Sequence, residues 1–264
     1  MNQEEAPQQQ APGMARLMAH VSARRVDTAL WCTRLATLIF SIGYLLPLFG
    51  SPTSAYYKAL MANAATSALR LHQRLPGVQF NLQFLGQVFM EDSAHYLLYS
   101  LVFLYSAPIT LALIPIFLFA LLHICSYTLT LLDLFGPNFL SLVRMAVGVA
   151  EVQSVNILRS IAFSEIFLFP VIILMIFFGR ASLLTAFTYY RFLTLRYASR
   201  RNPYTRNCFA ELRLTAETLS NHHNCPPAIR NLVHKSVALV SRLAPPVARP
   251  LRTQPISEFF PIFF

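Results

Sequence analysis

Charged residues are scarce in this sequence, and their scarcity argues against a soluble fold. Only 12% of the 264 residues are Asp, Glu, Lys or Arg, whereas soluble domains average roughly 25%. Hydrophobic residues make up 55% of the chain. A soluble protein of this length needs more polar surface, so the composition favours an integral membrane protein that crosses the bilayer several times.

The sequence also lacks the common signatures of catalysis and of metal binding. Its eight glycines are spread out, and it contains no G-x-G-x-x-G, P-loop, G-x-S-x-G or H-E-x-x-H pattern. None of the four cysteines stands in a C-x-x-C pair, so neither a zinc module nor a disulfide framework is indicated. We therefore expect no enzymatic activity, no cofactor and no metal. An intramembrane enzyme built on Glu165, His95 and Asp92 is the remaining alternative, although Asp92 or Ser93 is better explained as a helix N-cap.

The start of the chain lacks the basic and apolar regions of a cleaved signal peptide, so insertion is expected to depend on the first apolar run. Residues 1–25 are rich in Pro and Gln at first, and we expect them to form a disordered polar tail. No N-x-[ST] acceptor site for glycosylation occurs anywhere. The sequence thus carries no glycosylation mark of a lumenal segment.

Long apolar runs predict an all-α membrane domain over residues 26–198, with three to four spans. Runs near 30–50 and 160–179 each match about 30 Å of hydrocarbon at ~1.5 Å per residue. Residues 93–132 contain no Asp, Glu, Lys or Arg and are too long for one straight span. Because Pro108 interrupts them, we favour a helical hairpin of 93–106 and 109–131 over one kinked span.

Glu165 lies inside the last apolar run, where an ionisable side chain is costly and is by default a functional hypothesis. It could pair with Arg34 or Arg159, or line a polar path. We favour a structural hydrogen bond inside the helical bundle.

Two further segments have the spacing of amphipathic helices. Residues 55–75 place Leu60, Met61 and Ala64 on one face, with Asn63 and Thr66 on the other. This helix is expected either at the membrane interface or packed on the protein itself.

Residues 228–243 separate apolar from basic side chains more cleanly. The apolar half includes Leu232, Val233, Val237 and Val240, and the basic half includes Lys235 and Arg242. Binding to the membrane surface is favoured over packing against protein, because the surrounding sequence is basic.

Positive charge is concentrated in the last third of the chain. Residues 1–179 hold nine basic and eight acidic residues, whereas residues 180–264 hold twelve and three. A basic flank after the apolar runs carries Arg191, Arg196, Arg200, Arg201 and Arg206, with Tyr189, Tyr190 and Tyr197 expected at the level of the lipid headgroups. An RNA-binding arm would have such a composition, but the positive-inside rule explains it without nucleic acid.

By the positive-inside rule, this flank predicts that the basic C-terminal region, residues 199–245, lies in the cytosol. Residues 246–264 carry no assignment. Arg16, Arg24 and Arg25 favour the cytosol for the N-terminus as well, whereas an odd number of spans would put it in the lumen.

Several long segments together resemble the transmembrane protein 33 family, which includes the insect Krüppel homolog 2 proteins and yeast pore-membrane relatives. They are "ALMANAATSALRLHQRLP" (59–76), "EDSAHYLLYSLVF" (91–103), "NILRSIAFSEIFLFP" (156–170), "YYRFLTLRYASRRNPYTRNCFAELR" (189–213) and "SRLAP" (241–245). The likeness runs from about residue 26 to 245 and fits an animal member best, an insect one first. The ending after Pro245 departs from the family pattern.

The resemblance implies a non-enzymatic, multi-pass protein of the endoplasmic reticulum membrane and nuclear envelope. It implies reticulon-type proteins and nuclear pore components as partners beside the lipid bilayer, and a role in the tubular reticulum network and in pores. The alternative is an adaptor that modulates a channel or a stress-signalling protein of the same membrane.

Overall fold

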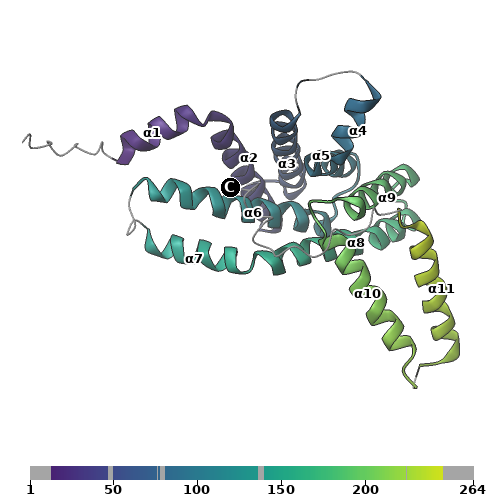
Figure 1. Cartoon of the computed structure of the whole chain (residues 1–264). Helices are drawn as coiled ribbons and strands as arrows, with labels where there is room; N and C mark the ends of the chain where they lie inside the picture. The colour runs from purple at the N-terminus through teal and green to yellow at the C-terminus, as the bar shows by residue number, and fades with distance from the viewer. Residues whose placement is uncertain are drawn as a thin grey trace, which may run out of the picture.

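The computed structural model describes residues 13–46, 50–75, 77, 81–135, 140–223 and 225–245. Every regular element in these ranges is an α-helix (Figure 1). They are α1 (Gly13–Ala23), α2 (Arg25–Leu45), α3 (Pro52–Arg74), α4 (Leu82–Met90), α5 (Asp92–Leu104), α6 (Thr110–Asp133), α7 (Ser141–Val152), α8 (Ser154–Phe177), α9 (Leu183–Ala198), α10 (Tyr204–Ser220) and α11 (Pro227–Leu243).

Three of these helices are long and apolar enough to cross a membrane: α2, α6 and α8, with 21, 24 and 24 residues. Each exceeds the ~20 residues that a spanning helix needs. The prediction of an all-α, multi-pass membrane protein is therefore confirmed.

Consecutive helices form three antiparallel hairpins. α2 packs on α3 and α8 packs on α9, whereas α5 meets α6 through the side chains of Tyr96 and Tyr99, with the rings of Tyr96 and Phe119 4.8 Å apart. The link from α8 to α9 shows how the chain reverses. Gly179 adopts φ +67°, which glycine tolerates without strain, and the N–H groups of Gly179 and Arg180 bond to the carbonyls of Ile176 and Met175 at 3.0 and 2.9 Å. These bonds end α8 as a Schellman motif.

The core of the bundle is a cluster of aromatic rings between α5, α8 and α9. Tyr99, Tyr189 and Phe192 are fully buried, and ring centroids of Tyr99 and Phe192 lie 5.0 Å apart. Tyr99 also donates a hydrogen bond to the carbonyl of Ala112 on α6 at 2.8 Å. Tyr189 was expected at headgroup level and is instead central to this core.

α3 packs on the protein partly through residues of its predicted polar face. Asn63 donates to the hydroxyl of Ser100 on α5 at 2.8 Å, and Thr66 donates to that of Thr33 on α2 at 2.8 Å. Met61, from the expected apolar face, is exposed. Helices in membranes associate through small and hydrogen-bonding side chains, since lipid covers apolar ones equally well.

The structure also corrects part of the expected disordered tail. Residues 13–23 form α1, because Met14, Leu17, Met18 and Val21 recur at helical spacing. The expected polar start (1–12) and the unassigned end (246–264) lie outside the described residues. Residues 93–131 form two helices, α5 and α6, separated by residues 105–109, rather than one kinked helix.

Candidate functional site

The buried carboxylate of Glu165 on α8 is the centre of the polar network. Its side chain is 0% exposed and its partner, Arg196 on α9, is 1% exposed. Arg196 Nε lies 3.2 Å from Glu165 Oε2, and the hydroxyl of Tyr96 on α5 donates to Oε1. Tyr189 donates to the backbone carbonyl of Glu165 at 2.8 Å. Glu165 thus joins three helices inside the bundle.

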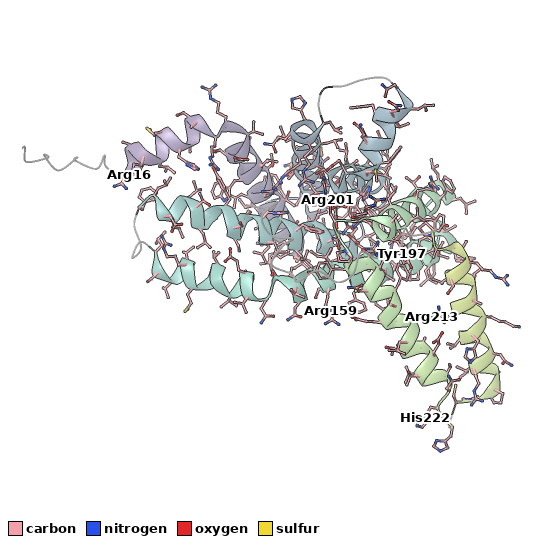
Figure 2. The ribbon with its side chains drawn as sticks, in the orientation of Figure 1. Arg16, Arg159, Tyr197, Arg201, Arg213 and His222 are labelled. Atoms are coloured by element: carbon pink, nitrogen blue, oxygen red, sulfur yellow. The ribbon has the colours of Figure 1, made fainter. Side chains whose placement is uncertain are left out.

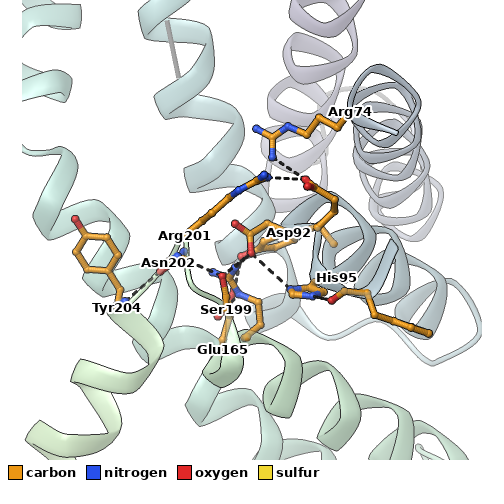
Figure 3. A network of polar contacts seen from close by, with 12 residues as sticks. Arg74, Asp92, His95, Glu165, Ser199, Arg201, Asn202 and Tyr204 are labelled. Atoms are coloured by element: carbon orange, nitrogen blue, oxygen red, sulfur yellow. Dashed lines mark hydrogen bonds and ion pairs between the residues drawn. The ribbon is translucent and has the colours of Figure 1, made fainter. Parts of the chain in front are cut away.

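Asp92, the first residue of α5, extends the network toward the C-terminal helices (Figure 3). Its Oδ1 lies 3.5 Å from Arg196 Nη1, and it accepts a 2.8 Å hydrogen bond from Ser199 at the end of α9. The Ser199 hydroxyl accepts from the N–H of Asn202, whose side chain accepts from the N–H of Tyr204. One chain of bonds therefore runs from the bundle to the start of α10.

A second acidic residue, Glu91, bridges two arginines next to this network. Its Oε2 lies 3.0 Å from Arg74 Nη1 on α3 and 2.6 Å from Arg201 Nη1 beyond α9. Figure 3 labels Arg74 and Arg201 and marks their contacts with dashed lines. The whole network therefore holds three positive and three negative side chains. The cations are Arg74, Arg196 and Arg201, and the carboxylates are Glu91, Asp92 and Glu165.

The charges of this network balance, and its central pair, Glu165 and Arg196, is fully buried, so the network acts as a clasp that joins α3, α5, α8 and α9. The guanidinium of Arg196 also stacks over the rings of Tyr96 and Phe119, at 5.2 and 5.9 Å. Across the part of the chain that the structure describes, no group of His, Cys, Asp and Glu is placed to hold a metal ion. Removing one member of such a buried pair leaves a charge without compensation and typically costs about 3–5 kcal/mol.

The structure corrects three sequence-based expectations here. Glu165 pairs with neither Arg34 nor Arg159: Arg34 is buried on α2, and Arg159 pairs with Glu211 on α10 at 2.9 Å. Neither Asp92 nor Ser93 is the N-cap of α5, because Glu91 occupies that position; its side chain makes no capping bond.

Arg196 is buried, unlike the other arginines of the basic flank. Arg191, Arg200 and Arg201 are exposed and Arg206 is partly exposed, whereas Arg196 is inside the bundle. The sequence did carry a signal: Tyr189, Phe192, Leu193 and Arg196 recur at intervals of three and four residues, which places Arg196 on the apolar face of α9.

The second part of the candidate site is the pair of helices α10 and α11, which projects away from the bundle (Figure 1). Figure 2 shows Arg213 and His222 along this pair, far from the clasp. Arg159 connects α8 to α10 through Glu211, and Arg230 of α11 donates to the carbonyl of Ser220 at 3.0 Å. One contact therefore attaches α10 to the bundle, and the other joins α10 to α11 at the far end of the pair.

α11 keeps most of its apolar face uncovered. Leu232 is 64% exposed, and Val233 and Val237 are partly buried. Lys235 and Arg242 are exposed on the opposite face. The exposed apolar residues of this helix are Ile229, Leu232, Leu239, Val240 and Leu243.

Cys208 lies at the contact between α10 and α8, with its Sγ 3.8 Å from the carbonyl of Arg159. Burial, together with the nearby Glu211 carboxylate, raises the pKa of the Cys208 thiol to about 11. A raised thiol pKa lowers the thiolate fraction at neutral pH, here by about a hundredfold, since each pKa unit is a factor of ten.

We expect Cys208 to resist alkylation in the detergent-solubilised protein. At pH 7.5, iodoacetamide should modify the partly exposed Cys225 first, and the rate at Cys208 should rise about tenfold per pH unit toward pH 11. Peptide mass spectrometry over a time course measures both rates. Equal rates for the two cysteines in the folded protein would contradict the packing of α10 on α8.

This fold and site define a class of protein: a multi-pass helical membrane protein. Internal ion pairs join its helices, and a pair of helices projects from the bundle. The family model of "Transmembrane protein 33/Nucleoporin POM33" matches residues 9–246. The chain therefore belongs to the transmembrane protein 33 family, as its sequence motifs indicated.

Curated relatives cover nearly the same length. The chain is 48% identical over 238 residues to Transmembrane protein 33 of Homo sapiens, covering 89% of this chain and 96% of that one. It is 47% identical over 231 residues to Krueppel homolog 2 of Drosophila melanogaster, covering 88% and 83%. A Caenorhabditis elegans homolog is 43% identical over 232 residues, covering 86% and 85%. No solved structure matches the chain significantly.

Proposed function

We propose that this protein is a non-enzymatic organiser of the endoplasmic reticulum and nuclear envelope membranes. In this role it inserts its bundle into the bilayer, binds the cytosolic lipid surface through α11, and supports the tubular reticulum and nuclear pores. Reticulon-type proteins and pore components are the proposed partners. The observation that carries the proposal is the exposed apolar face of α11 opposite Lys235 and Arg242.

The physical argument starts from what each face of α11 can contact. An amphipathic helix with cations on its polar face binds at the headgroup level of anionic membranes, with its apolar face in the acyl boundary. The basic flank adds the exposed Arg191 and Arg200, each able to contribute about 1 kcal/mol near an anionic surface. Membership of a membrane protein family supports this setting.

Reconstitution of the purified full-length protein tests the proposal directly. We expect spherical proteoliposomes to become tubules as the protein-to-lipid ratio rises, scored by electron microscopy. A control variant with Glu217→Gln alters only a solvent-accessible ion pair within α10 and should tubulate like the wild type. Vesicles that stay spherical with correctly inserted protein would overturn direct membrane shaping.

A second candidate function is that of an adaptor for a channel or a stress-signalling protein in the same membrane. It is favoured by the exposed Leu214 and Leu219 on α10, which give the projecting pair apolar contact area beyond α11. Inert vesicles together with a partner captured by the full-length protein, and lost on Leu214→Ser, would favour this role.

A further inference from the structure

The three helical hairpins all turn at the same end of the bundle. The hydroxyl of Tyr57, near the start of α3, donates to the carbonyl of Ser106 in the link between α5 and α6 at 3.0 Å. The hydroxyl of Tyr44, near the end of α2, lies 2.9 Å from the hydroxyl of Thr110 at the start of α6. Pro108 and Phe178 line a common hollow between the second and third links. We call this common end the turn end.

Large apolar side chains are exposed at the turn end. Tyr105 is 89% exposed and Leu183 is 76% exposed, and Leu46, Phe177, Phe178 and Leu184 are also exposed. The described residues among 42–58, 101–113 and 174–187 include Lys58 and Arg180 but no Asp or Glu. A concentration of exposed apolar surface of this kind marks a contact with membrane or protein rather than with water.

The opposite end of the same helices carries the charges. Asp92 begins α5, Glu165 lies twelve residues before the end of α8, and Arg196 lies thirteen residues after the start of α9. At ~1.5 Å per residue, the apolar layer between these charges and the turn end is about 18–20 Å thick. This is less than the ~30 Å of a bilayer's hydrocarbon core.

Several polar backbone groups of the second and third links have partners within the protein. Irregular backbone at membrane depth requires that its polar groups find partners inside the protein. Gly179 and Arg180 bond back to α8, Ser106 accepts from Tyr57, and the N–H of Ala112 bonds to the carbonyl of Ile109 at 2.9 Å. The short helices α5 and α9, with 13 and 16 residues, run to the turn end beside the longer helices α6 and α8.

We infer that all three hairpins enter the bilayer from one side, turn end first, so that α1, α4, α7 and the α10–α11 pair lie on the same side of the membrane. The inference rests on the membrane insertion in the proposed function and specifies its direction. The competing arrangement has α2, α6 and α8 as the sole crossings. It would put α1 and α7 opposite to α10 and would leave Leu183 and Leu184 in water.

Cysteine accessibility separates the two arrangements. In full-length protein whose four cysteines are replaced by alanine, single cysteines are placed at exposed positions: Met14→Cys before α2, Ser141→Cys at the start of α7, and Thr215→Cys on α10 as reference. Cells with a selectively permeabilised plasma membrane are treated with a membrane-impermeant maleimide, before and after detergent opens the reticulum lumen.

We expect Met14→Cys and Ser141→Cys to be labelled to at least half the extent of Thr215→Cys before detergent is added. Labelling of both only after detergent would overturn the inference and support three crossings. A second measurement avoids cysteine replacement: an Asn-X-Thr acceptor cassette placed before Met14 or at Ser141 should remain unglycosylated. A glycan removed by endoglycosidase at either position would equally overturn it.

This test and the test of the proposed function fail independently. One-sided labelling combined with spherical proteoliposomes would keep the inferred insertion and reject membrane shaping. Tubules formed by a protein whose Met14 and Ser141 positions are lumenal would keep the shaping role and reject one-sided insertion.

Discussion

Glu165→Gln should lower the free energy of unfolding by about 3–5 kcal/mol. Glutamine keeps the size of the side chain and its hydrogen-bonding oxygen, but it removes the charge that compensates Arg196, which is 1% exposed. Asp92 remains 3.5 Å from the guanidinium and is partly exposed, so it replaces only part of the lost interaction. Chemical unfolding in detergent micelles, followed by helical circular dichroism, measures the change.

Two controls separate the buried charge from helix packing in general. Glu211→Gln breaks the pair with Arg159, in which both side chains are nearly half exposed, and should cost no more than about 1 kcal/mol. The double variant Glu165→Gln with Arg196→Met removes both buried charges and should regain most of the loss. If Glu165→Gln cost no more than Glu211→Gln, the clasp would not hold the bundle.

Replacing Leu232, Leu239 and Val240 together with serine should weaken vesicle binding by the α11 segment at least about a hundredfold. Burial of each apolar side chain contributes roughly 1.5–3 kcal/mol, and all three are exposed in the protein and available to lipid. Binding of a peptide of residues 226–245 to vesicles containing phosphatidylserine measures the loss. Circular dichroism of the bound peptides checks that helicity is retained.

The matched control changes the opposite face without altering charge. Asn231→Ser with Ala238→Ser lies on the polar side of α11 and should change affinity less than about threefold. Lys235→Gln and Arg242→Gln should each reduce affinity by about fivefold at low salt, and this loss should disappear in uncharged vesicles. Equal losses for the apolar and polar variants would rule out membrane binding through the apolar face.

The sequence was informative wherever a structure depends on local pattern. The apolar runs marked α2, α6 and α8, and a helical wheel separated the two faces of α11, because length and periodicity are properties of neighbouring residues. The resemblance of long motifs indicated the family. The interruption at Pro108 likewise marked the division between α5 and α6.

Sequence reasoning was wrong for several side chains whose place depends on a distant partner. Arg196 was grouped with Arg191 and Arg200 because all three follow the apolar runs. The carboxylates that pair with Arg196 inside the bundle lie on α5 and α8, far away in the sequence. Asn63 and Thr66 were placed on the polar face of α3, and the sequence could not show that Ser100 and Thr33 bind them inside the bundle. Local polarity predicts exposure only when the rest of the fold offers no partner.

The clasp has a consequence for how the protein is made. Asp92 precedes Arg196 by 104 residues, and Glu165 precedes it by 31. At a synthesis rate of ~5–20 residues per second, roughly 5–20 s pass between the synthesis of Asp92 and that of Arg196. During translation the first two hairpins therefore carry an acidic residue at the membrane with no cation from α9. We expect nascent chains that end before Arg196 to be retained by insertion chaperones and degraded, so that α9 acts as the step that completes assembly.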